Sequence, residues 1–307
     1  MRNTWRRRRG KVRVIVTGVK TGRIASDIRF RQTAQAPGTR HSALSECTET
    51  SDRLTIDNSQ PTIDNSHTEM QCLDLTLATP AENLALDEAL VDEADADSYV
   101  GETLRLWEPP LPMVVLGRSS KLADEVLVDA CRARGIPVFR RASGGAAIVT
   151  GPGCLMYALI LSLRERPALR IIENAHRLVL ETLVDALRTK SGNLRRQGIS
   201  DLALGERKCS GNSLRIKRDH LLYHGTLLYD FPLALIDECL AMPPRRPTYR
   251  CDRPHHAFVA NLPVAGAALR RAVIDAWNSW QPRADWPRSR TARLAAESYR
   301  PIDIPHR

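Results

Sequence analysis

The pattern of the chain changes at Met70, and this change is the strongest constraint on its fold. Between Thr33 and Met70 the sequence is rich in Ser, Thr, Asn, Gln and Pro and holds few large apolar residues. Such a segment cannot bury enough surface to offset the entropy lost on ordering. After Met70, apolar residues recur at helix and strand spacings. We therefore expect one folded domain over residues 70–280 and a flexible Arg- and Pro-rich tail over 281–307.

Residues 1–69 are open to three interpretations. The segment is Arg-rich and its first acidic residue is Asp27, as in a targeting peptide. It also fits a disordered basic arm. The third interpretation is that translation starts at Met70, and we favour it because the ordered pattern begins directly after that residue. We therefore expect this segment to be disordered or not translated.

The net charge of +10 is unevenly distributed. Residues 1–69 hold 13 basic and 7 acidic residues, whereas the remaining chain holds 32 and 28. This split argues against the interpretation of the domain as a non-catalytic basic adaptor that binds nucleic acid. No apolar stretch reaches the length of about 18 residues that a membrane span needs. The seven cysteines form no CxxC pair, which fits reduced thiols in a cytoplasmic protein.

Helix and strand patterns alternate along residues 70–280. The clearest helix start is at Thr79, where Pro80 fits the first helical position and Glu82 can complete a capping box. The predicted helices cover residues 80–94, 122–134, 168–189, 232–240 and 265–280. The predicted strands cover residues 104–107, 113–117, 136–141, 156–163, 201–205 and 221–229, with a hairpin or loop between the last two. The fold class is therefore α+β, a mixed α/β domain.

Two motifs carry the chemistry. The first runs from a strand into a loop of small residues and reads Arg140-Arg141-Ala142-Ser143-Gly144-Gly145-Ala146-Ala147. Its glycines allow backbone N–H groups to approach an anion, and the arginines add charge suited to phosphate or carboxylate. Taken alone, it also fits a tight turn between strands.

The second motif reads Asp201, then Lys208-Cys209-Ser210-Gly211, then His224-Gly225-Thr226. A lysine held at a Ser-Gly bend beside an anion-binding loop can neutralise an α-phosphate and orient a carboxylate for attack. An isolated lysine of this kind is more often a solvated loop residue, so the two motifs must be considered together.

In this order and spacing, the motifs resemble the lipoate–protein ligase A/B and biotin ligase superfamily, and most of all its lipoate branch. The helix segment Asn83-Leu84-Ala85-Leu86-Asp87-Glu88 adds to the resemblance. It implies a mixed sheet flanked by helices, like the catalytic domain of class II aminoacyl-tRNA synthetases. It also implies that lipoate or octanoate reacts with ATP and Mg²⁺ to give the acyl-adenylate. The acyl group then passes to a lysine of a lipoyl carrier domain, in a 2-oxoacid dehydrogenase E2 subunit or the glycine cleavage H protein.

The resemblance also assigns roles to individual residues. Lys208 matches the catalytic lysine that binds the acyl carboxylate and the α-phosphate, and Asp201 matches an aspartate near the nucleotide and its Mg²⁺. No cage of protein ligands for a metal is expected. The remaining residues that match the site for ATP and the acyl-adenylate are Arg141, Ser143, Gly144, Gly145, Ala146, Ala147, Ser210, Gly211 and His224.

The sequence departs from the family pattern in the glycine loop, in the segment Val149–Cys154 that follows it, and at the C-terminal end. Ala146 stands where the family loop usually has a third glycine, and alanine disfavours a positive φ. The 27 residues after Trp280 are too few for the C-terminal accessory domain of the best-known ligases. This points to a stand-alone ligase, to a ligase with a separate accessory chain, or to the alternative of an ATP-independent octanoyltransferase, which works through a cysteine thioester. Cys239 is the first candidate nucleophile, although a small buried hydrophobic role is the commoner one for a cysteine.

Overall fold

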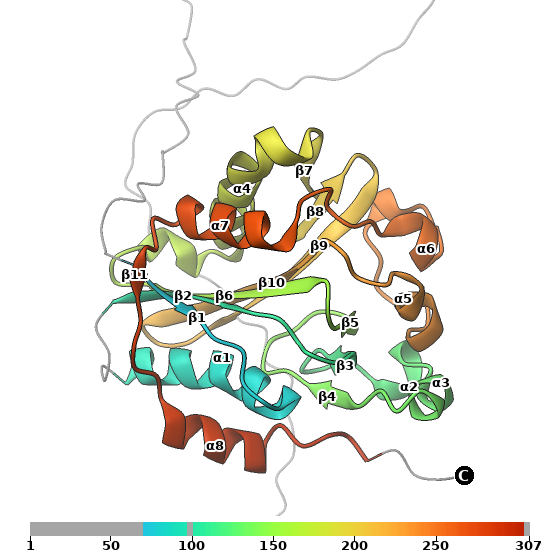
Figure 1. The fold of residues 1–307 in the computed structure, drawn as a ribbon, viewed down its shortest axis with the longest axis horizontal. Helices are drawn as coiled ribbons and strands as arrows, with labels where there is room; N and C mark the ends of the chain where they lie inside the picture. Colours follow the sequence, from blue (N-terminus) through green and yellow to red (C-terminus); the bar gives the residue numbers. More distant parts are fainter. Residues whose placement is uncertain (1–69, 97–100, 304–307) are drawn as a thin grey trace, which may run out of the picture. The chain divides into compact units, whose positions relative to one another are not determined.

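The computed structural model describes residues 70–96 and 101–303 (Figure 1). Its strands form an eight-stranded sheet, in the order β11-β1-β2-β6-β10-β9-β8-β7, and a three-stranded sheet, in the order β4-β3-β5. The strands are β1 (Met70–Asp74), β2 (Glu102–Trp107), β3 (Met113–Leu116), β4 (Val138–Arg140), β5 (Ile148–Thr150), β6 (Cys154–Ser162), β7 (Leu194–Gln197), β8 (Asp201–Leu204), β9 (Arg207–Ile216), β10 (His220–Leu228) and β11 (Gln281–Pro282).

Helices cover both faces of the large sheet, with α4 and α7 on one face and α1 and α8 on the other (Figure 1). The helices are α1 (Pro80–Asp95), α2 (Leu122–Glu125), α3 (Val128–Ala133), α4 (Ile172–Ser191), α5 (Ala234–Cys239), α6 (His255–Phe258), α7 (Gly266–Ala276) and α8 (Arg288–Glu297). Parallel and antiparallel strand pairs both occur in the large sheet. The predicted mixed α+β fold, a sheet flanked by helices, is confirmed.

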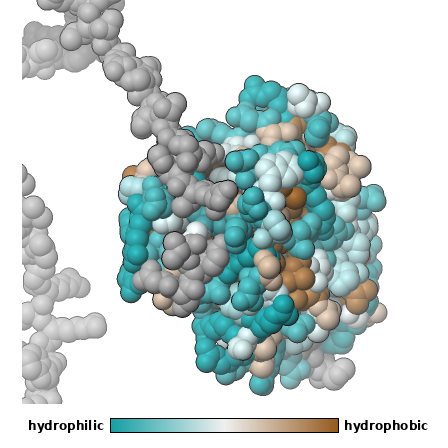
Figure 2. Space-filling model, turned by 60° about the vertical axis from the view of Figure 1, so that its left-hand side comes forward, coloured by the Kyte–Doolittle hydropathy of each residue, from teal (hydrophilic) through white to brown (hydrophobic). Residues whose placement is uncertain are grey.

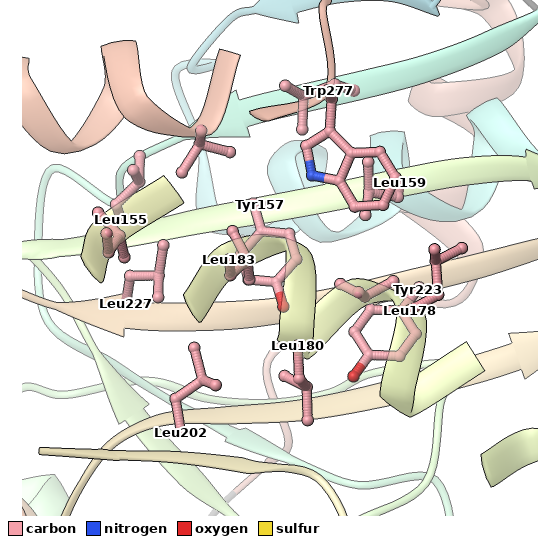
Figure 3. Close-up of a cluster of buried hydrophobic side chains, with 14 of the residues drawn as sticks. Leu155, Tyr157, Leu159, Leu178, Leu180, Leu183, Leu202, Tyr223, Leu227 and Trp277 are labelled. Atoms are coloured by element: carbon pink, nitrogen blue, oxygen red, sulfur yellow. The ribbon is translucent and has the colours of Figure 1, made fainter. Parts of the chain in front are cut away.

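The core lies against the central strand β6, all nine residues of which are buried. Because helices cover both faces of this strand, its sequence is almost continuously apolar rather than alternating. On the α4 side, Leu159 packs in one cluster with Leu180, Leu183 and Trp277 (Figure 3). On the α1 side, a smaller cluster contains Leu86, Leu90, Ala158, Ile160 and Leu222.

Several predicted elements are confirmed, and one helix differs. Helix α1 begins with the expected capping box between Thr79 and Glu82. The predicted helix over 122–134 is instead two short helices, α2 and α3. The break occurs because the N–H of Leu127 donates to the carbonyl of Cys239 over 2.8 Å and Val126 forms a β-bridge with Leu240.

The segment after residue 280 corrects the expectation of a flexible tail. Strand β11 pairs with β1, and α8 lies along α1 (Figure 1). Tyr299 donates to Glu88 over 2.6 Å, and Arg290 forms an ion pair with Asp92 at 2.5 Å. Leu294 of α8 is buried. Two basic residues of this segment, Arg283 and Arg290, therefore pair with acidic residues of α1 that the sequence alone does not bring alongside them.

The face shown in Figure 2 is mostly hydrophilic, with apolar residues in small separate patches. Within residues 70–96 and 101–303, no helix combines the length and the apolar character that crossing a membrane requires. The expectations for residues 1–69 lie outside the described residues.

Candidate active site

The loop between β4 and β5 is held by the guanidinium group of Arg141. This side chain is buried, and it donates to the carbonyls of Val115, Gly144 and Ala146 at 3.1, 2.6 and 3.0 Å. Its Nε also donates to the Ser143 hydroxyl at 3.1 Å. Burial lowers the pKa of Arg141 to about 10, while Glu125 opposes this shift, so the group stays charged at neutral pH. The arginine predicted to contact nucleotide therefore also shapes the loop.

The rest of the loop is fixed by contacts from two other segments. The Glu125 carboxylate accepts from the N–H of Ala147 at 2.6 Å, and the carbonyl of Ser143 accepts from the N–H of Arg118 at 2.8 Å. Gly145 takes the left-handed conformation, with φ of 91°, whereas Ala146 has a negative φ. Alanine in place of the third glycine is therefore compatible with this loop shape.

A second wall is formed by β8 and β9. Lys208 Nζ lies 2.7 Å from Asp201 Oδ1, and the Tyr249 hydroxyl donates to Asp201 Oδ2 at 2.8 Å. Burial raises the pKa of Tyr249, and the neighbouring Asp201 carboxylate adds to the shift. The Lys208 side chain is 30% exposed. A Cβ atom on Gly211 would lie 3.0 Å from Nζ, so this glycine leaves room for the ammonium group.

His224 on β10 connects the loop to helix α1. Its Nε2 lies 2.5 Å from Ser143 Oγ, and its Nδ1 lies 3.4 Å from Asp87 Oδ2. Asp87 in turn pairs with the fully buried Arg105 of β2. A row of polar side chains therefore runs from the core to the glycine loop.

These elements enclose a pocket of about 150 Å³. Eight of the predicted site residues line it: Arg141, Gly145, Ala146, Ala147, Asp201, Lys208, Gly211 and His224. Ser143 and Ser210 are buried behind its surface, at 2% and 1% exposure, and Gly144 contributes its carbonyl to the loop contacts. The two sequence motifs, about 60 residues apart, therefore meet at one pocket.

Cys239 is not among the residues that line this pocket. It lies on α5, is fully buried and belongs to the apolar cluster around the small sheet. Its carbonyl accepts a hydrogen bond from the Cys131 thiol at 3.7 Å. Burial raises the pKa of the Cys239 thiol. A nucleophilic cysteine needs the opposite environment, which lowers its pKa and exposes its sulfur.

Among the residues around the pocket that were not predicted, Asp87 and Tyr249 contact predicted site residues directly. Asp87 lies between Leu86 and Leu90 on the buried side of α1, and an acidic residue on an apolar helix face is a signal that it has a charged partner. Tyr249 is far from Asp201 in sequence, and nothing in its local pattern indicates their contact. Within the described part of the chain, no group of His, Cys, Asp and Glu is arranged to hold a metal by itself.

Comparison with solved structures supports the same architecture. The chain superposes on a structure described as a bi-partite lipoate protein ligase and its E2 lipoyl domain from Thermoplasma acidophilum, with a TM-score of 0.61 and 24% identity. The superposition covers 75% of this chain and 92% of that one. At this identity, the similarity shows the fold.

Sequence comparison defines the family. Residues 79–269 match the model of the lipoyl protein ligase A/B catalytic domain, and the chain belongs to this family. Lipoate–protein ligase 1 of Staphylococcus aureus is 26% identical over 186 residues, which cover 61% of this chain and 54% of the relative. Octanoyltransferase LipM of Geobacillus kaustophilus is 25% identical over 207 residues, covering 59% and 73%. The chain spans about half the length of the ligases it matches first.

Proposed function

We propose that this chain activates lipoate or octanoate with ATP and transfers the acyl group to a lysine of a lipoyl carrier domain. The observation that carries the proposal is the position of Lys208. Its ammonium group enters the same pocket as the glycine loop and is held there by one ion pair, with Asp201. A ligand phosphate or carboxylate competes directly for such a cation. The family to which the chain belongs agrees with this chemistry.

In the first step, formation of the acyl-adenylate, the pocket residues have different roles. The loop from Gly145 to Ala147 offers backbone groups beside the pocket, and Arg141 holds the loop in shape. Lys208 lies where it can contact a carboxylate and an α-phosphate together. By placing both reactants against one fixed cation, the site converts a bimolecular encounter into attack within a bound complex. The same cation offsets the negative charge that grows as the carboxylate attacks.

The residues present also fit a Mg²⁺ ion that arrives with ATP. Mg²⁺ usually takes one or two carboxylates from the protein and its remaining ligands from phosphates and water. The Asp201 carboxylate lines the pocket and is the residue that would hold the ion once Lys208 turns to the substrate. When bound, the ion would add positive charge next to the phosphates.

The partners that follow from the proposal are lipoyl domains of 2-oxoacid dehydrogenase E2 subunits and the glycine cleavage H protein. We also propose that the chain works in the cytoplasm, because its cysteine usage fits a compartment that keeps thiols reduced. The similarity of the fold to the ligase solved with its E2 lipoyl domain supports this class of acceptor.

The test is ATP–pyrophosphate exchange with the full chain, with and without lipoate or octanoate. We expect exchange that depends on the added acid and stops in Lys208→Ala. Exchange that is independent of the acid, or unchanged in the variant, would contradict the proposal. Absence of exchange, combined with octanoyl transfer from an acyl carrier protein without ATP, would instead assign the chain to the octanoyltransferases.

A further inference from the structure

Four polar side chains from four segments form a continuous row beside the pocket. Arg105 of β2 pairs with Asp87 of α1, Asp87 faces Nδ1 of His224, and Nε2 of His224 meets the Ser143 hydroxyl. Arg105 is fully buried, and Asp87 is 4% exposed. Of the four, His224 alone lines the pocket. The row therefore connects one pocket-lining histidine to a buried ion pair.

The charges in this row fix which nitrogen of His224 carries a proton. Burial alone would raise the pKa of Asp87, but Arg105 and then His224 more than offset it and hold the pKa below its ordinary value. An ionised carboxylate only accepts, so Nδ1 must be the donor. Neutral His224 then keeps its lone pair at Nε2, where the Ser143 hydroxyl donates to it. The Ser143 oxygen still accepts from Arg141 Nε.

The second step of the proposed function requires a base in this place. The carrier lysine attacks as a neutral amine, whereas a free lysine with its pKa of about 10.4 is mostly an ammonium ion at neutral pH. Lys208 is itself a cation, and both oxygens of Asp201 already have partners, Lys208 and Tyr249. Among the described residues that line the pocket, His224 is the one that presents a free basic nitrogen once Ser143 turns away.

We infer that His224 is the general base for acyl transfer and that Asp87 is the positioning residue that keeps its Nε2 unprotonated. In this step the lysine ammonium first loses one proton to water, and the neutral amine nitrogen then forms a bond to the acyl carbon. The bond from that carbon to the adenylate phosphate oxygen breaks, and AMP leaves with the electron pair. The second proton, which the nitrogen releases as the amide forms, passes to Nε2. The incoming amine replaces the Ser143 hydroxyl as the partner of Nε2. This inference rests on the proposed function.

The test separates the two half-reactions. Synthetic octanoyl-adenylate is supplied to the full chain together with a lipoyl domain, and transfer is measured in a single turnover. We expect His224→Ala to slow transfer by about 10²-fold or more, and to affect ATP–pyrophosphate exchange far less. Added imidazole should restore part of the transfer in this variant, because it can replace the missing base. Imidazole should not accelerate the wild-type chain.

His256→Ala is the matched control, because this histidine is 70% exposed, pairs with Asp237 and lies outside the pocket. It should transfer at the wild-type rate and show no response to imidazole. Equal loss of both half-reactions in His224→Ala without rescue would show a structural role and overturn the inference. Wild-type transfer in that variant would overturn it as well. A wild-type chain that neither exchanges nor transfers would refute the proposed function, and the inference with it.

Asp87→Asn gives an independent readout of the positioning role. The substitution leaves Arg105 buried without its charge partner, and an uncompensated buried charge destabilises proteins strongly. The thermal unfolding of the Asp87→Asn variant must therefore be measured as well. The ¹⁵N NMR spectrum of the imidazole, recorded on the folded fraction of the protein, shows which nitrogen of His224 is protonated. We expect Nδ1–H in the wild type and a shift toward Nε2–H in the variant, together with slower transfer. An unchanged tautomer accompanied by slower transfer would contradict the role assigned to Asp87.

Discussion

The two walls of the pocket use their cations differently. On the loop wall, Arg141 is buried and donates to four oxygen atoms of its own chain. On the strand wall, Lys208 is 30% exposed and has one charged partner, Asp201. A buried cation with that many acceptors cannot turn to a ligand without leaving them unsatisfied. The partly exposed lysine can exchange its partner at little cost, because ion pairs in contact with solvent contribute only about 0–1 kcal/mol.

The contrast shows that charge alone does not identify the residue that acts on the ligand. In the sequence, the adjacent arginines 140 and 141 are the more prominent feature, yet Arg140 also donates to backbone carbonyls, at 2.7 Å from Gly117 and 2.8 Å from Ser120. Both arginines therefore stabilise the loop against the end of β3. The single lysine of the second motif is the cation that remains available.

The largest effect is expected for Lys208→Ala. Removal of a charged donor aimed at the reacting groups costs about 10²–10³-fold in rate, so ATP–pyrophosphate exchange should fall by at least that factor. Stability to urea should change by less than about 1 kcal/mol, because the lost ion pair is partly exposed. Arg207→Ala, next in sequence and exposed, is the control and should keep full exchange. If Lys208→Ala kept full exchange, Lys208 would not be the cation that acts on the ligand, and the proposed difference between the two walls would be wrong.

Arg141→Met should lose both stability and activity. Methionine keeps most of the apolar stem but leaves the carbonyls of Val115, Gly144 and Ala146 without their donor. Hydrogen bonds from a charged group contribute about 1.5–3 kcal/mol each, and water will replace some of them. We expect a loss on the order of 2–4 kcal/mol in urea unfolding, with exchange reduced as the loop loosens. If Arg141→Met were as stable as the wild type, Arg141 would have a ligand-binding role without the structural one.

The site was more predictable than the contacts that hold it together. Both motifs converge on the pocket as expected, because each has a local signature: a strand that runs into glycines, and a lysine at a Ser-Gly bend. The Asp201–Tyr249 contact and the Arg105–Asp87–His224 row join segments distant in sequence, and no local period encodes them. The position of Asp87 on an apolar helix face indicates that it has a charged partner. The sequence of the helix does not identify that partner as Arg105.

The same limit applies to the fold. Predicted strand 156–163 corresponds to β6, since nine consecutive residues buried on both faces leave a clear apolar run. The sequence predicts a hairpin or loop where β9 lies, because the strand is polar and four of its ten residues line the pocket instead of the core. Helix α8 escaped prediction for a related reason: its Arg290 pairs with Asp92 of α1, 198 positions away in the sequence.

Gly117→Ala tests the loop wall from outside the pocket. A Cβ at this position would lie 1.9 Å from the carbonyl oxygen of Gly145, so the loop must move. Overpacking of this kind typically costs about 1–3 kcal/mol, and we expect a thermal unfolding shift of that size with a weaker loss of exchange than in Lys208→Ala. Gly144→Ala is the stability control, because a Cβ there meets nothing within 4 Å. Equal stability of the two variants would show that the loop is not packed against Gly117.

The smallest effect is expected for Cys239→Ala, which tests the alternative cysteine chemistry. The thiol is buried among apolar side chains, so its removal should cost about 1 kcal/mol for the small cavity and change acyl transfer by less than about twofold. Cys251→Ala, at an exposed cysteine, is the control and should change neither. Transfer from octanoyl-adenylate and from an octanoyl thioester should be measured for both variants. A folded Cys239→Ala chain that fails to transfer from the thioester would require the loop and α5 to rearrange, because the present packing gives its sulfur no access to the pocket.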